Sequence, residues 1–135
     1  IDYTDYENAV LKKEDRRKHI LFVDDNPLLL RNMKALVSDR YRVSIAVSGA
    51  QAFEILKKDC PDLIFLDYEM PVINGKMFLR AIRANQQFAG LPVIFLSAVA
   101  DREYIKELLE LKPEGYVLKP AKKECIMEMI EKYAG

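Results

Sequence analysis

The stretch Leu63-Ile64-Phe65-Leu66-Asp67 is an apolar run that ends in a carboxylate. Short runs rich in Val, Ile, Leu and Phe are typical of strands buried on both faces of a parallel sheet. Three further apolar stretches also end in a polar side chain: Leu21-Phe22-Val23-Asp24-Asp25, Val93-Ile94-Phe95-Leu96-Ser97 and Tyr116-Val117-Leu118-Lys119. If the strands are parallel, all four polar ends meet at one edge, where open α/β sheets bind ligands. The sequence therefore predicts a site as well as a fold.

The composition is that of a globular protein with a single domain. The chain has 135 residues, half of them hydrophobic, and its 21 basic residues balance 21 acidic ones, so no overall field favours nucleic acid or an anionic membrane. No apolar run approaches the roughly 20 residues of a bilayer-spanning helix, and signal-peptide features are absent. Cys60 and Cys125 lack metal-ligand spacing, so we expect reduced thiols in a cytoplasmic protein.

Strand and helix patterns alternate from His19 onward. Asn26 is the expected N-cap of the first helix, with Pro27 at its first position. Five β–α units with short connections predict an α/β fold with a doubly wound parallel sheet. The expected strands cover residues 19–24, 42–47, 62–66, 93–97 and 116–119, and the expected helices cover 27–39, 48–58, 75–85 and 101–111, before a last helix with Ile126, Met129, Ile130 and Tyr133 on one face.

Residues 1–18 differ from the rest because charged side chains crowd around a few apolar ones. This composition predicts a linker or short helix that leads in from an upstream domain, followed by one globular domain over residues 19–135. The chain begins at Ile1 rather than Met, which favours a segment cut from a longer protein.

The acidic residues at the strand ends suggest a metal site. Asp24 and Asp25 alone could simply cap the following helix, but Asp67 adds a third carboxylate at the same edge. Carboxylates held this close repel one another unless a cation joins them, and hard oxygen ligands suit Mg²⁺. The sequence therefore favours a Mg²⁺ site.

The other two strand ends add the groups that phosphoryl transfer requires. Lys119 would bring positive charge and Ser97 a hydroxyl, although a lysine at a strand end is often only solvated. Aspartate carboxylates accept phosphoryl groups. Asp67 is the best placed nucleophile, because the acidic pair and Lys119 would flank it.

These motifs together resemble the receiver domain of two-component response regulators. The resemblance rests on Asp67-Tyr68-Glu69-Met70-Pro71-Val72-Ile73-Asn74-Gly75, with Val23-Asp24-Asp25, Ser97-Ala98 and Lys119-Pro120, and it covers roughly residues 19–135. It implies a flavodoxin-like fold with strand order 2-1-3-4-5 and helices on both faces of the sheet.

The resemblance also implies roles for individual residues. Asp67 would be the phosphoacceptor, and Asp25 and Asp67 would give carboxylates to Mg²⁺, with Asp24 acting mainly through water and Glu69 supplying its backbone carbonyl. Lys119 would bind a phosphoryl oxygen.

Two further positions match the family's switch residues. Ser97 would move its hydroxyl toward the phosphoryl group, and Tyr116 would change rotamer unless it is an ordinary strand aromatic. The Lys119-Pro120 peptide resembles a bond that is cis in the family. Glu69 and Val99 occupy two variable positions that flank the acyl phosphate, and the acid at Glu69 would either orient or repel the attacking water.

The partners implied are a histidine kinase or a histidine phosphotransfer protein as phosphodonor, and an output partner at the fourth helix, fifth strand and fifth helix. No direct contact with nucleic acid or membrane is expected. In the first helix, Leu28 and Leu30 would flank the core face. Either both leucines pack at the core margin, or Leu30 is exposed and helps to dock the donor helix.

The receiver hypothesis describes a signalling module that promotes only its own phosphorylation and dephosphorylation, not a turnover enzyme. A pseudo-receiver that only binds partners would not require Asp25, Asp67, Ser97 and Lys119 together. A haloacid-dehalogenase-type phosphatase needs a second Asp two residues after its nucleophile, where this chain has Glu69. A flavin-binding protein of similar topology would need a hydroxyl-rich loop after its first strand.

Overall fold

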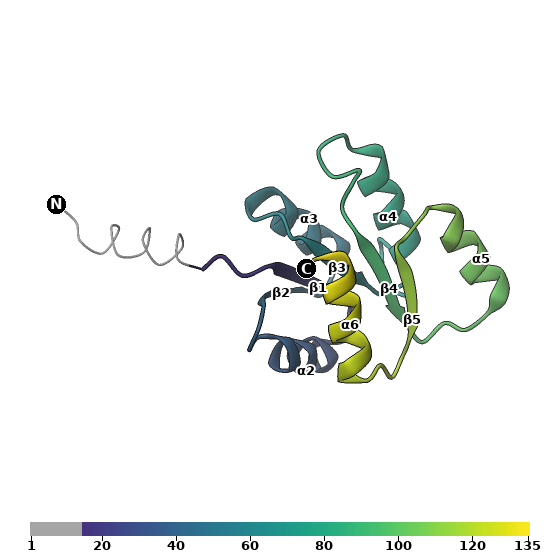
Figure 1. Ribbon diagram of the computed structural model, residues 1–135. Coiled ribbons are helices and arrows are strands. Elements are labelled where there is room, and N and C mark those ends of the chain that lie inside the picture. The colour runs from purple at the N-terminus through teal and green to yellow at the C-terminus, as the bar shows by residue number, and fades with distance from the viewer. Residues whose placement is uncertain (1–14) are drawn as a thin grey trace.

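A computed structural model describes residues 15–135, and its sheet pairs five strands in the order β2-β1-β3-β4-β5 (Figure 1). Every pair of neighbouring strands is parallel. The strands are β1 (His19–Val23), β2 (Arg42–Ala46), β3 (Leu63–Leu66), β4 (Val93–Ser97) and β5 (Gly115–Leu118). Both the doubly wound sheet and its predicted strand order are confirmed.

Helices cover both faces of this sheet. They are α2 (Pro27–Val37), α3 (Gly49–Lys58), α4 (Gly75–Ala84), α5 (Arg102–Glu110) and α6 (Lys123–Tyr133). One face is covered by α2 and α6, and the other by α3, α4 and α5 (Figure 1). Each predicted element is present, with ends that differ by one or two residues, as helix and strand ends commonly do. Within residues 15–135, no helix is long and apolar enough to cross a membrane.

The predicted linker over residues 1–18 lies mostly outside the described residues, which begin at Asp15. Both cysteines, Cys60 and Cys125, are free thiols, as expected.

The central strands are apolar throughout because both of their faces are covered. In β1, Leu21 and Val23 pack in the cluster beneath α3, α4 and α5, whereas Ile20 and Phe22 pack in the cluster beneath α2 and α6. Phe22 also stacks on Phe65 of β3, with ring centroids 4.9 Å apart. Burial of all these side chains supplies much of the free energy that holds the sheet between its helices.

Helix α2 begins as predicted but turns a different side chain to solvent. The Asn26 side chain accepts hydrogen bonds from the backbone N–H groups of Leu28 and Leu29, and Pro27 is the first helical residue. Leu30 is fully buried, whereas 62% of Leu28 is exposed. Both alternatives are therefore wrong, since Leu30 is not exposed and Leu28 does not pack at the core margin. The core face of α2 is centred closer to Leu30 than the sequence pattern indicated.

The loop between β3 and α4 contains a residue in an unfavourable backbone conformation. Val72 has a φ of 68° and its side chain is 93% exposed. A left-handed conformation crowds the Cβ atom of an L-residue, and a β-branched side chain makes the crowding worse.

Replacing Val72 with asparagine should therefore stabilise the fold by about 1 kcal/mol, since asparagine tolerates positive φ and no buried contact is lost. Urea unfolding measures the gain. Val72→Thr is the matched control, because it keeps the branched Cβ and should change stability by much less. Equal midpoints for the two variants would contradict the assignment of strain to Val72.

Candidate functional site

The strand register brings two predicted site residues together. Val23 pairs with Leu66, so the residues that follow them, Asp24 and Asp67, lie at the same edge of the sheet. The backbone N–H of Asp67 donates to the Val23 carbonyl at 2.9 Å, and that of Asp24 donates to the Ala46 carbonyl at 3.0 Å. The backbone of both aspartates is therefore fixed by the sheet itself.

Asp24, Asp25 and Asp67 form an acidic cluster at this edge. Asp24 and Asp67 are buried, with 3% and 5% of their surfaces exposed, whereas Asp25 is exposed. One carboxylate oxygen of each residue lies within 4.8 Å of the others. Three carboxylates at this spacing form a donor set that can hold a hard divalent cation, with water filling its remaining positions.

Lys119 also reaches the cluster, as the sequence predicts. Its Nζ lies 2.5 Å from Asp24 Oδ2 and 3.5 Å from Asp67 Oδ1. Its backbone N–H donates to the Ser97 carbonyl at 2.9 Å, and the Lys119–Pro120 peptide is cis, as the resemblance implies. One lysine thus faces two buried carboxylates, and its closer partner is Asp24.

The electrostatics of the site favour additional positive charge. Burial raises the pKa of Asp67 above its usual value, and the charge of Asp24 raises it further. Lys119 opposes both effects without cancelling them. A bound cation would favour the ionised carboxylate, which is the form that can act as a nucleophile.

Ser97 and Tyr116 are both tied to the loop that follows β4. Ser97 is buried, and its Oγ accepts a hydrogen bond from the backbone N–H of Val99 at 3.3 Å. The Tyr116 hydroxyl donates to the Val99 carbonyl, and its ring lies 5.9 Å from that of Phe95. Because burial raises the pKa of Tyr116, its hydroxyl stays a neutral donor. Glu69 is exposed in the loop after β3.

Two residues support the site through contacts that the sequence did not predict. The Asn26 backbone N–H donates to Asp24 Oδ1 at 2.9 Å, which orients that carboxylate. A Cβ atom at Gly75 would lie 2.3 Å from the carbonyl oxygen of Asp67. The sequence predicted a helix that begins at residue 75, but not that its first residue packs directly against the backbone of Asp67.

Removing the Lys119 charge should destabilise the fold when no divalent cation is present. In Lys119→Met, Asp24 and Asp67 lose their shared cation, and we expect a loss of about 2 kcal/mol in the presence of EDTA. Mg²⁺ should restore part of this stability, because it can neutralise the same carboxylates. Urea unfolding with and without Mg²⁺ measures both effects, with the exposed Lys123→Met as control. Equal stabilities of the two variants in EDTA would contradict the assigned pairing.

Fold and site together define a doubly wound α/β domain with an acidic cluster and a lysine at the carboxyl edge of its sheet. The response regulator receiver domain family matches residues 20–131. Chemotaxis protein CheY from Pseudomonas aeruginosa is 35% identical over 115 residues, which cover 84% of this chain and 93% of that protein. The chain therefore belongs to the response regulator receiver domain family, whose members are signalling modules of two-component systems.

A solved structure and a larger relative agree with this assignment. The structure of chemotaxis protein CheY4 from Vibrio cholerae matches with a TM-score of 0.81 and 25% identity, covering 87% of this chain and 98% of that one. Sensor histidine kinase TmoS from Ectopseudomonas mendocina is 35% identical over 75% of this chain, a match that spans only 10% of the kinase. Homologous domains thus occur both as nearly whole chemotaxis proteins and as small parts of sensor kinases.

Proposed function

We propose that this domain accepts a phosphoryl group onto Asp67 with Mg²⁺, from a phosphohistidine of a histidine kinase or a histidine phosphotransfer protein. The observation that carries the proposal is the position of Asp67, a buried member of the acidic cluster that also faces the Lys119 ammonium. A pseudo-receiver would not need these charges to converge on one carboxylate.

In the proposed reaction, a carboxylate oxygen of Asp67 attacks the phosphorus atom and the phosphorus–nitrogen bond of the donor breaks, so that the imidazole leaves. Asp25 and Asp67 would hold Mg²⁺ through their carboxylates, Asp24 mainly through water, and Glu69 through its backbone carbonyl. The ion would neutralise charge on the phosphoryl oxygens. Lys119 would bind another of these oxygens, which requires its Nζ to leave Asp24, where it lies 2.5 Å from Oδ2.

Phosphorylation would then bias the surface formed by α5, β5 and α6. Ser97 would turn its hydroxyl toward the phosphoryl group, and Tyr116 would change rotamer as the Val99 loop rearranges. Tyr104 and Leu109 on α5 and Leu118 on β5 are about half exposed, so they offer apolar contacts to an output partner on this surface.

The phosphodonor would approach beside α2. A surface hollow of about 260 Å³ lies next to Lys119, between the first turns of α2 and the segment from Pro120 to Ala121. Leu28 is exposed and lines this hollow, whereas Leu30 is buried and does not line it. A helix of the donor with an apolar face would fit this hollow, with Leu28 in the role considered for Leu30.

The remaining expectations become part of this proposal. The domain would extend over residues 19–135 after a linker over 1–18, and it would act in the cytoplasm without direct contact with nucleic acid. It would promote only its own phosphorylation and dephosphorylation.

Incubation with acetyl phosphate and Mg²⁺, followed by intact-mass measurement, tests the proposal. We expect a gain of one phosphoryl group that EDTA prevents, because the acidic cluster needs the cation. A gain that EDTA leaves unchanged, or no gain with any small phosphodonor, would overturn the proposal. Repeated turnover of an added phosphomonoester would favour a phosphatase instead.

A further inference from the structure

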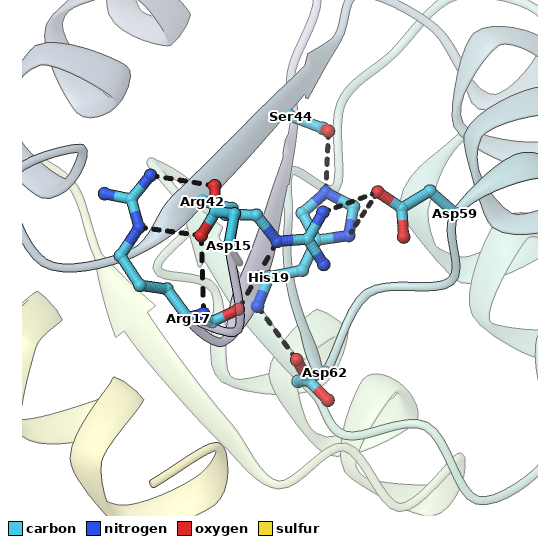
Figure 2. A network of polar contacts seen from close by, with 7 residues as sticks. All are labelled: Asp15, Arg17, His19, Arg42, Ser44, Asp59 and Asp62. Atoms are coloured by element: carbon cyan, nitrogen blue, oxygen red, sulfur yellow. Dashed lines mark hydrogen bonds and ion pairs between the residues drawn. The ribbon is translucent and has the colours of Figure 1, made fainter. Parts of the chain in front are cut away.

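The end of the sheet opposite Asp67 contains a buried histidine with one unsatisfied nitrogen. His19, the only histidine in the chain, is the first residue of β1 and is 1% exposed. Its Nε2 lies 2.6 Å from Ser44 Oγ on β2, whereas its Nδ1 has no hydrogen-bond partner among residues 15–135. The nearest anionic atom is Asp59 Oδ2, 3.8 Å from Nδ1 (Figure 2). A buried polar atom without a partner is costly, so a role in a change of state is a natural explanation.

The same Asp59 oxygen supports a chain of contacts that holds the entry segment, which we define as residues 15–18. Arg42 Nη1 donates to Asp59 Oδ2 at 2.8 Å, and Arg42 Nε donates to the Arg17 carbonyl at 3.3 Å. Arg17 in turn pairs with Asp15 (Figure 2). Its Nη1 also donates to the Ser38 carbonyl at 2.9 Å. The entry segment is thereby tied to β2 and to the end of α2.

One backbone hydrogen bond beside these side chains joins the entry segment directly to β2. The Arg42 N–H donates to the Lys18 carbonyl at 3.0 Å, and the His19 N–H donates to Asp62 Oδ2 at 2.8 Å. The bond from Arg42 must break for the entry segment to leave β2, so exchange of the Arg42 amide measures that opening.

The charged groups around His19 come from three segments. Arg42 lies on β2, Asp59 follows α3, and Asp62 precedes β3. The thiol of Cys60, next to Asp59, is neutral because burial raises its pKa. Burial lowers the pKa of His19 from its usual value and Arg42 lowers it further, whereas Asp59, the backbone of Cys60 and Asp62 favour the proton. The folded state therefore binds this proton less readily than the unfolded state. The stability that neutral His19 contributes is fully present above the unfolded pKa, 6.5, and is lost as the pH falls below it.

We infer that His19 is an acid-sensitive latch for the entry segment. When the imidazole takes a proton from solvent, a second cation appears beside Arg42 and competes for Asp59 Oδ2. Arg42 then loses its carboxylate, its contact with Arg17 weakens, and the entry segment separates from β2. The latch lies at the opposite end of the sheet from Asp67 and acts on the segment through which the chain enters the domain.

Nuclear magnetic resonance of the full chain tests this inference, because its single histidine gives a single imidazole titration. As the pH falls from 7.5 and His19 takes up its proton, we expect amide exchange at Arg42, corrected for the intrinsic effect of pH, to accelerate about tenfold. The Ile64 amide, which donates to the Pro92 carbonyl, serves as the internal control and should not change. Titration of the imidazole without faster exchange at Arg42 would overturn the latch.

Two variants separate the latch from a general acid effect. His19→Gln keeps a polar side chain that cannot be protonated, so exchange at Arg42 should lose its pH dependence. Asp59→Asn alters an exposed side chain, and Arg42 should then exchange rapidly already at pH 7.5, with little further change at pH 5.5. The inference fails if His19→Gln keeps the wild-type pH dependence. If His19→Gln does not fold, the Asp59→Asn variant decides instead. The inference then fails if Arg42 in Asp59→Asn exchanges as slowly at pH 7.5 as it does in the wild type.

Discussion

Replacing Asp67 with asparagine is expected to reduce phosphoryl uptake from acetyl phosphate to background. The variant keeps the size and the backbone hydrogen bond of the residue but lacks the nucleophilic carboxylate. It also removes one of the three carboxylates that can hold the cation. Intact-mass measurement in the presence of Mg²⁺ checks the result.

Urea unfolding of the variant tests whether this loss reflects unfolding. In the folded protein, the pKa of Asp67 is raised above its ordinary 3.8, so ionised Asp67 destabilises the fold at neutral pH. This destabilisation disappears as the pH falls through the raised pKa and the carboxylate takes up a proton. An uncharged asparagine avoids the cost. In EDTA at pH 7, Asp67→Asn should therefore unfold at a higher urea concentration than the wild type.

Asp39→Asn is the matched control, since Asp39 is exposed between α2 and β2, away from the site. It should take up a phosphoryl group as the wild type does. Uptake by Asp67→Asn equal to that of this control would show that another residue is the acceptor.

Replacing Gly75 with alanine should destabilise the fold by about 3 kcal/mol, the upper end for overpacking a well-packed interior. The new Cβ would lie 2.3 Å from the Asp67 carbonyl oxygen and 2.8 Å from Tyr68 Cα. Both are backbone atoms, so relief requires the loop to move away from β3 and to break the bond from the Gly75 N–H to the Tyr68 carbonyl, now 2.8 Å. Asp67 should also lose its alignment with the acidic cluster.

Gly90→Ala is the matched control, because a Cβ at Gly90 meets nothing within 4 Å. Its stability should stay within about 0.5 kcal/mol of the wild type. Urea unfolding compares the two variants. If Gly75→Ala were as stable as Gly90→Ala, the close packing of the loop against Asp67 would be incorrect.

The sequence predicted the fold well because its signals are local and repeated. The apolar runs that end at Val23, Leu66 and Ser97 are strands, and Asn26 begins α2 as expected. Parallel pairing then forces the strand ends to one edge, so the meeting of Asp24, Asp67 and Lys119 followed from topology rather than from detailed packing.

The features that were not predicted depend on packing between distant segments. Whether Leu28 or Leu30 is buried depends on how α2 is rotated about its axis against the sheet. A rotation of only part of a turn would exchange the buried and the exposed leucine. The contact of Gly75 with Asp67 and the network around His19 join segments far apart in the chain. Hydrophobic periodicity contains no information about such distances.

Locating the phosphoryl group within the chain tests the central claim most directly. Borohydride reduces an acyl phosphate to an alcohol, so the phosphorylated protein can be reduced, digested and analysed by mass spectrometry. The proposed function predicts homoserine at position 67 and unmodified aspartate at positions 24 and 25. Homoserine at position 24 or 25, or none in a protein that has gained a phosphoryl group, would contradict it.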